Sequence, residues 1–117
     1  MSDLKVWLNG KLCGADRAKL PIFDRGYLYG DGVFETMRGY AGIVFKLDEH
    51  LARLVNSLEA ARIKSPYSRE RLKRSITQTL KANKLKSAYI RLTITRGEGR
   101  FGLEHKDVFR PNVVIIA

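Results

Sequence analysis

Two stretches with the alternating pattern of β-strands each combine an arginine with an aromatic residue. In VFETMR, alternation places Phe34 and Arg38 on one face of the strand, and in SAYIRLTIT it places Tyr89 and Arg91 on one face. The other face of SAYIRLTIT is purely aliphatic, so it should pack against a hydrophobic core. Guanidinium groups beside rings suit an anionic ligand with an apolar part, because arginine grips a carboxylate with two hydrogen bonds. A polar sheet face that simply meets solvent fits the same periodicity equally well.

His50 and Arg53 stand about one helical turn apart in EHLARL. Leucines recur there at spacings of three and four residues, which predicts an amphipathic helix, and both residues lie on one flank of its apolar stripe. Taken alone, Arg53 is more often a surface residue than a ligand. His50 has no carboxylate or cysteine at metal-ligand spacing, so a structural hydrogen bond is its more common role. With a single cysteine, Cys13, the sequence predicts neither a disulfide nor a metal site.

The stretch GEGRFG follows the second strand candidate and matches the G-x-G-x-x-G pattern of dinucleotide-binding folds. That fold also needs a helix directly after the glycines, but LEHKDVFRP has no apolar helical stripe and leads into Pro111. A dinucleotide site is therefore not expected. We predict instead a glycine-rich mobile loop of the kind that closes over a binding site.

The length of 117 residues, the hydrophobic share of 44% and the charged share of 29% describe one ordinary globular domain. No apolar run approaches the roughly 18 residues of a membrane span, and the N-terminus does not resemble a signal peptide, so we expect a cytoplasmic protein. The formal net charge is +10, and residues 64–86 supply most of it. The solvated face of an amphipathic helix explains this excess. A nucleic-acid groove is the alternative, although the segment offers only Tyr67 as a stacking platform.

Turn signals and periodicities together predict an α+β protein. Asn9-Gly10 is a two-residue hairpin signal, and Ala41-Gly42 marks a second turn. Strands are expected at 4–8, 11–13, 33–40, 43–47, 87–95 and 112–117, helices after an N-cap at Asp48 and at about 68–84, and irregular chain at 15–25. We expect an antiparallel sheet with two helices packed on one face, as a two-layer sandwich.

Four blocks of sequence occur in an order that resembles the N-terminal domain of class IV (fold type IV) aminotransferases: LNG, DRGYLYGDGVFETMRGY, FKLDEHLARLVNSLEAARI and KSAYIRLTITRGEGRFGLE. This family of pyridoxal-phosphate enzymes contains branched-chain and D-amino-acid aminotransferases and aminodeoxychorismate lyase. The resemblance covers almost the whole chain. It implies pyridoxal 5'-phosphate as the cofactor, amino acids and 2-oxo acids as substrates, and a full-length protein that forms a homodimer or a higher homo-oligomer.

The resemblance also implies roles for individual residues. Arg53, in the H-x-x-R-L block, corresponds to the arginine that binds the cofactor phosphate. The residues that correspond to the lining of the substrate pocket are Tyr29, Phe34, Arg38, Tyr89 and Arg91. The glycine-rich loop covers a neighbouring subunit's site in dimeric relatives, and its counterpart here is Arg100, Phe101, Gly102 and Leu103.

One part of the family pattern lies outside this chain. In the family, the lysine that carries the cofactor, the glutamate that faces the pyridine nitrogen and the remaining phosphate ligands belong to a second, C-terminal domain, beyond the equivalent of Ala117. None of the ten lysines here matches that lysine's motif. Residues 1–117 are therefore expected to be the N-terminal domain of a class IV aminotransferase, inactive alone and not expected to retain the cofactor.

The motifs point in two directions within the family. Branched-chain enzymes usually read FEGIR where this chain has FETMR, and threonine at that place is frequent in aminodeoxychorismate lyases. TRGEGRFGLE and AYIR are more similar to branched-chain aminotransferases of archaeal and bacterial type. We therefore expect part of an aminotransferase for a branched-chain amino acid and 2-oxoglutarate, with aminodeoxychorismate lyase as the alternative. A basic nucleic-acid-binding module is the alternative from another class.

Overall fold

A six-stranded antiparallel sheet is the centre of the computed structural model, which describes residues 3–99 and 110–117. The strand order is β2-β1-β6-β5-β3-β4, and each neighbouring pair is antiparallel. The strands are β1 (Lys5–Leu8), β2 (Lys11–Gly14), β3 (Gly32–Tyr40), β4 (Ile43–Val44), β5 (Ala88–Thr95) and β6 (Asn112–Ile116). The predicted antiparallel sheet is confirmed, with β3 and β5 as its longest pair.

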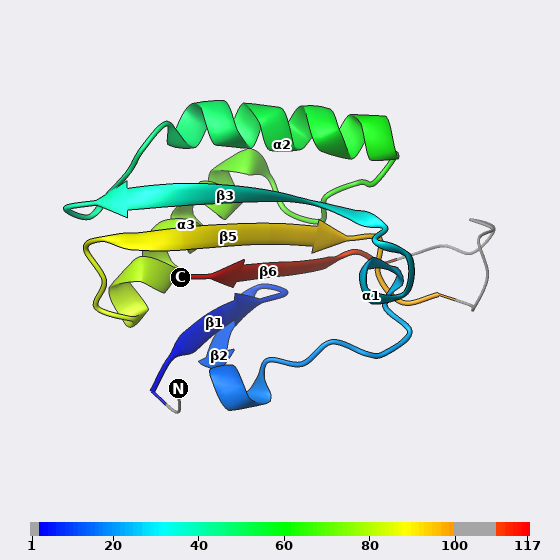
Figure 1. Ribbon diagram of the computed structural model, residues 1–117, viewed down its shortest axis with the longest axis horizontal. Helices are drawn as coiled ribbons and strands as arrows, with labels where there is room; N and C mark the ends of the chain where they lie inside the picture. Colours follow the sequence, from blue (N-terminus) through cyan, green and yellow to red (C-terminus); the bar gives the residue numbers. More distant parts are fainter. Residues whose placement is uncertain (1–2, 100–109) are drawn as a thin grey trace.

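Helices α2 (Leu47–Ala61) and α3 (Arg69–Ala82) cover one face of the sheet (Figure 1). Their apolar stripes meet alternate strand residues in a single buried cluster. This cluster contains Trp7, Met37, Ile90, Leu92, Ile94, Val113 and Ile115 from the strands and Leu51, Leu54, Leu58, Leu72, Ile76 and Leu80 from the helices. The predicted two-layer sandwich is therefore confirmed. Across the described ranges, no helix has both the length and the apolar character that a membrane crossing needs.

The chemistry of turns and caps places two of these elements where the sequence predicts them. Asn9 and Gly10 join β1 to β2 with positive φ angles of 49° and 98°, as a two-residue hairpin turn requires. Ser68 caps α3, and its hydroxyl accepts a hydrogen bond from the backbone N–H of Arg71 at 3.1 Å. Both signals are short and local, so they act without help from the rest of the fold.

The connection from β3 to α2 differs from the sequence prediction. The returning strand β4 contains only Ile43 and Val44, and α2 is capped by Lys46 rather than by Asp48. Lys46 adopts a left-handed conformation with φ of 53°, which ends the extended chain, and its carbonyl oxygen accepts the first helical bond from the His50 N–H at 3.0 Å. Asp48 instead lies in the first turn, where its negative charge favours the positive end of the helix.

The segment 15–25, expected to be irregular, contains a 3₁₀ turn (Ala15–Arg17), and α1 (Arg25–Tyr29) begins at its last residue, in a stretch where no helix was predicted. Asp24 caps α1, because its carboxylate accepts a hydrogen bond from the Gly26 N–H at 2.7 Å. Gly30, in the left-handed region with φ of 65°, ends the helix. A helix of five residues is too short to show a 3.6-residue period, so the sequence pattern did not reveal it.

Buried polar contacts fix α1 to the end of the sheet. The Asp24 carboxylate, 1% exposed, accepts hydrogen bonds from Thr95 Oγ1 at 2.8 Å and from Asn112 Nδ2 at 2.6 Å. The carbonyl oxygen of Gly97 accepts a bond from the Arg25 N–H at 2.9 Å. These contacts tie α1 to the ends of β5 and β6, which anchors the chain that leads into β3.

Gly97 occupies a position that no other residue can take. Its φ is +99°, and a Cβ atom built there would overlap the carbonyl oxygen of Arg110. Glycine adopts this conformation freely and has no side chain to clash. The chain leaving β5 therefore contacts the chain that enters β6 directly, beside α1.

Candidate functional site

The open face of β3 and β5 carries the arginines and rings that alternation grouped together. Phe34 and Tyr89 are 54% and 70% exposed. Arg38 faces Tyr89 directly across the two strands, with its guanidinium carbon 4.4 Å from the ring centre. Arg91 lies over Phe34, with the corresponding distance at 3.9 Å. The structure thus confirms that these four side chains share one face, opposite the helices.

The two arginines on this face keep their hydrogen-bonding groups available. A guanidinium over a ring is attracted by the face of the ring and gives none of its N–H groups to an oxygen acceptor. Among the residues that the structure describes, neither Arg38 nor Arg91 forms an ion pair. The open face therefore presents two uncompensated positive charges between aromatic surfaces, which suits a carboxylate with an apolar side chain.

Tyr29 lies apart from these four side chains, in the last position of α1. The guanidinium carbon of Arg25 is 4.8 Å from its ring centre. Figure 1 shows α1 at the end of the sheet where β3 begins. The structure therefore places Tyr29 at the end of the sheet rather than on its open face. The predicted loop, 100–103, lies outside the described residues.

Arg53 is held at the edge of the sheet by Glu35, to which the sequence patterns gave no role. Glu35 belongs to β3 and is only 4% exposed. One of its oxygens lies 2.7 Å from His50 Nδ1 and accepts a hydrogen bond from Arg53 Nη2 at 2.8 Å. The other accepts a bond from Arg53 Nε at 2.9 Å. His50 therefore has the structural hydrogen bond that is most common for a histidine without metal-ligand partners.

The pair of Glu35 and Arg53 has a buried negative end and an exposed positive end. The hydrogen bonds from Arg53 keep the pKa of the Glu35 carboxyl group below its ordinary value; burial opposes this shift and His50 reinforces it. The same contact raises the pKa of Arg53. Because the Arg53 side chain is 67% exposed, the positive charge reaches the surface while the carboxylate stays beneath α2.

A hollow of about 270 Å³ opens beside this pair. Its lining residues are Lys46, Glu49, His50 and Arg53. Lys46 and Arg53 are the cations of this lining and Glu49 is its carboxylate, while Glu35 lies buried behind Arg53. The free donors of the two cations suit a phosphate group, which arginine binds through N–H groups. This donor set therefore fits the phosphate of pyridoxal 5'-phosphate, and the open sheet face fits the carboxylate of an amino acid.

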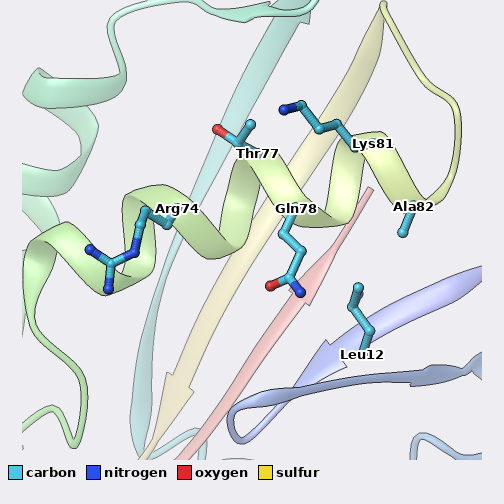
Figure 2. Close-up of a pocket in the computed structure, with 6 residues that line it drawn as sticks. All are labelled: Leu12, Arg74, Thr77, Gln78, Lys81 and Ala82. Carbon is cyan, nitrogen blue, oxygen red and sulfur yellow. The ribbon is translucent and has the colours of Figure 1, made fainter.

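A second hollow, of about 510 Å³, lies between α3 and β2 (Figure 2). Its lining contains two cations and no aromatic ring: Leu12, Arg74, Thr77, Gln78, Lys81 and Ala82. Tyr67, the aromatic residue of the basic segment, packs edge-on against the buried Trp7 with 5.1 Å between ring centres. Grooves for single-stranded nucleic acid combine cations with exposed stacking platforms, so this surface gives the nucleic-acid hypothesis little support.

Two sequence patterns read together would have found Glu35. Alternation in VFETMR already puts Glu35 on the core side of the strand with Val33 and Met37. A carboxylate on a core face needs hydrogen-bonding partners, because an unpaired buried charge is costly. His50 and Arg53, on the flank of the next helix, are the side chains placed to supply those hydrogen bonds.

Comparisons with known proteins show the family of this chain. A family model described as amino-transferase class IV matches residues 32–117. A Methanocaldococcus jannaschii protein, provisionally named a branched-chain-amino-acid aminotransferase, is 44% identical over 114 residues, which cover 97% of this chain and 40% of that protein.

Solved structures with the same fold include a T.th. branched-chain amino acid aminotransferase complexed with N-(5'-phosphopyridoxyl)-L-glutamate. Its TM-score is 0.90 at 27% identity, over 97% of this chain and 40% of that chain. The 4-amino-4-deoxychorismate lyase from Pseudomonas aeruginosa has a TM-score of 0.75 at 31% identity, over 94% of this chain and 38% of that chain. The chain thus spans about two fifths of the length of these relatives. It belongs to the class IV aminotransferase family.

Proposed function

We propose that residues 1–117 are the N-terminal domain of a pyridoxal-phosphate-dependent aminotransferase, which transfers an amino group between a branched-chain amino acid and 2-oxoglutarate. The observation that carries this proposal is the open face of β3 and β5, where Arg38 and Arg91 lie over aromatic rings. The C-terminal cofactor domain, with the lysine that carries the cofactor, is the remainder of the enzyme in this proposal. The greater length of the relatives supports that division.

The open face meets the demands of two different substrates. A branched-chain amino acid has one carboxylate and an apolar side chain, whereas 2-oxoglutarate has a second carboxylate in place of the apolar group. Arg38 and Arg91 supply guanidinium donors for the carboxylates, and Phe34 and Tyr89 supply ring surface for the apolar side chain. Tyr29 adds a further ring from the end of the sheet. An arginine stacked on a ring can therefore serve both substrates at one place.

Arg53 holds the cofactor phosphate in this proposal, at the hollow next to Glu35. When bound, pyridoxal 5'-phosphate supplies the carrier for the amino group and the electron sink that makes the α-proton removable. Arg53 contributes charge-assisted hydrogen bonds that fix the phosphate end. The phosphopyridoxyl-glutamate in the T.th. aminotransferase supports both this cofactor and glutamate as a reaction partner.

The test uses the protein at its full encoded length, purified with pyridoxal 5'-phosphate. Incubation with L-leucine and 2-oxoglutarate should form glutamate, measured by chromatography. D-alanine as the donor tests the stereochemistry, because D-amino-acid aminotransferases share the family. The 117-residue chain alone should form no glutamate. Failure of every amino donor with the full-length protein would contradict the proposal, and so would turnover by the 117-residue chain.

Aminodeoxychorismate lyase is the second candidate, and Thr36 favours it. Thr36 is exposed on the open face and lies directly opposite Arg91. Its hydroxyl can hydrogen-bond a polar substrate ring, whereas the glycine of FEGIR has no side chain to offer. Pyruvate release from aminodeoxychorismate by the full-length protein, without transfer to 2-oxoglutarate, would establish the lyase instead.

We also propose that the full-length protein is a cytoplasmic homodimer or higher homo-oligomer, in which residues 100–103 cover the site of a neighbouring subunit. Light scattering on the purified protein measures its assembly state. A fully active monomer would contradict this part of the proposal.

A further inference from the structure

The contacts of Arg53 leave one side of its guanidinium group available. Nε and Nη2 both donate to Glu35, at 2.9 and 2.8 Å, so the edge that joins these atoms faces β3. Nη1 has no hydrogen-bond partner in the described part of the chain, and the side chain is 67% exposed. The unused donors therefore lie on the side of the guanidinium group away from Glu35, and Arg53 lines the hollow together with Lys46 and His50.

Stability does not explain this pairing well. An ion pair with an exposed arginine contributes little to folding, because water screens the charge and ordering the side chain costs entropy. The buried Glu35 carboxylate does need its donors, but an apolar residue at that position would need none. What the pair provides is a fixed orientation, since it fastens a flexible surface side chain to β3, whose backbone is paired along its length with β5.

His50 fixes the carboxylate from the same helix. Its Nδ1 lies 2.7 Å from the Glu35 oxygen that also accepts the Arg53 Nη2 bond. A carboxylate only accepts hydrogen bonds, so Nδ1 carries the hydrogen in this contact. Glu35 is thus held between β3 and α2 by two side chains, and it cannot turn away without losing both contacts.

We propose that Glu35 and His50 are positioning residues, which hold Arg53 with its free donors toward the cofactor phosphate. This inference rests on the proposed function of Arg53. This arrangement raises the affinity for the phosphate, because the arginine loses its conformational freedom on folding rather than on binding.

Positioning and simple electrostatics predict opposite results when Glu35 is neutralised. Glu35 is an anion close to a site for an anion, so its charge alone weakens phosphate binding, and its removal should tighten binding. If Glu35 positions Arg53, its removal should weaken binding instead. The direction of the change therefore separates the two explanations.

The experiment measures binding to the cofactor-free protein at its full encoded length. Pyridoxamine 5'-phosphate is the probe because it lacks the aldehyde that reacts with lysine, and pyridoxamine is its phosphate-free counterpart. Glu35→Gln should raise the Kd of pyridoxamine 5'-phosphate by about five- to tenfold, which is the scale of one impaired charge-assisted hydrogen bond. The same substitution should leave the Kd of pyridoxamine unchanged.

Glu49→Gln is the matched control, because Glu49 lines the same hollow but forms no ion pair with Arg53 in the described part of the chain. It should leave the Kd of the phosphate probe equal or lower. In an Arg53→Ala background, Glu35→Gln should add no further loss, because the residue that it positions is gone. An equal or lower Kd for Glu35→Gln in the wild-type background would overturn the inference.

A further variant covers the case in which Glu35→Gln fails to fold. Glu35→Asp keeps the charge but shortens the side chain by one methylene, so Arg53 should be drawn back and the Kd of the phosphate probe should rise. An unchanged Kd for Glu35→Asp would overturn the inference. Unchanged binding in Arg53→Ala alone would instead refute the proposed function of Arg53, so the two failures are distinguishable.

Discussion

The arginines of this domain differ between two regions in their burial and in how their N–H donors are used. At the end of the sheet, the side chains of Arg25 and Arg96 are 2% and 11% exposed, and both donate to the Asp31 carboxylate. Arg96 also donates to the carbonyl oxygens of Ala61 and Arg62, at 2.7 and 3.1 Å, where α2 ends. The hydrogen bonds of these buried arginines are used within the fold.

On the open face and at its edge, Arg53 and Arg91 are exposed, Arg38 is half-buried, and the donors of all three are only partly used. Arg53 gives one edge to Glu35, and Arg38 and Arg91 lie over rings. The number of N–H groups that an arginine does not use within the fold therefore indicates whether it is structural or available to a ligand. The presence of a neighbouring carboxylate does not distinguish the two cases. Asp31 contacts two arginines, and Glu35 contacts an arginine and a histidine, yet they lie in regions with different proposed roles.

The largest effect is expected in the buried region. Asp31→Ala should lower the free energy of unfolding by about 3–5 kcal/mol, because it leaves the charges of Arg25 and Arg96 buried without their carboxylate. Urea denaturation monitored by circular dichroism measures this loss. A loss below about 1 kcal/mol would remove the contrast between the two regions, since that is the range of exposed ion pairs.

Arg53→Ala should act on binding rather than on folding. The Kd of pyridoxamine 5'-phosphate should rise by about 10- to 100-fold, the range for a lost hydrogen bond to a charged group. The denaturation midpoint should fall less than in Asp31→Ala, because water can reach the space left by a side chain that is 67% exposed. Fluorescence titration and urea denaturation of the same preparation separate the two effects. Equal losses of stability in both variants would contradict the comparison.

Arg91→Ala tests the open face. We expect the KM for 2-oxoglutarate to rise by about tenfold, because a guanidinium that meets a carboxylate is lost, with little change in the denaturation midpoint. Arg74→Ala, an exposed arginine of α3, is the matched control and should leave the KM unchanged. A KM that responds equally to both substitutions would point to overall charge instead of a specific contact.

The smallest effect concerns pH. The pKa of Glu35 is lowered in the folded protein, so Glu35 adds stability above its unfolded pKa, and this contribution is lost as the pH falls from the ordinary value of 4.5 through the lowered folded value. The difference in denaturation midpoint between wild type and Glu35→Gln should therefore shrink between pH 5 and the acid limit of folding. A difference that stays constant over this range would show that the Glu35 contacts do not depend on its charge.

Local patterns account for most of what the sequence predicted about the fold. The leucine stripe of α2 and the Asn9-Gly10 turn each lie within a few positions, so one sequence reveals them. The sequence did not predict α1, because Asp24, which anchors it, bonds to Thr95 and Asn112 at separations of 71 and 88 positions. Contacts of that range leave no periodic trace in the chain.

The candidate site divides in the same way. The common face of Arg38 and Arg91 follows from strand alternation, which is a local property. The pairing of Glu35 with Arg53 depends on how α2 packs beside β3, so neither pattern showed it alone. The individual roles in binding came from the resemblance to a family, because residue type and spacing also fit a solvated surface.

The backbone at position 97 restricts how the end of the sheet beside α1 can vary. There the chain that leaves β5 touches the chain that enters β6 and holds the first residue of α1. Even an added methyl group would force the segments that leave β5 and enter β6 apart. This would shift α1, and Tyr29 would move with it. One atom placed at this junction would thus alter the proposed substrate site while every residue on the open face kept its identity.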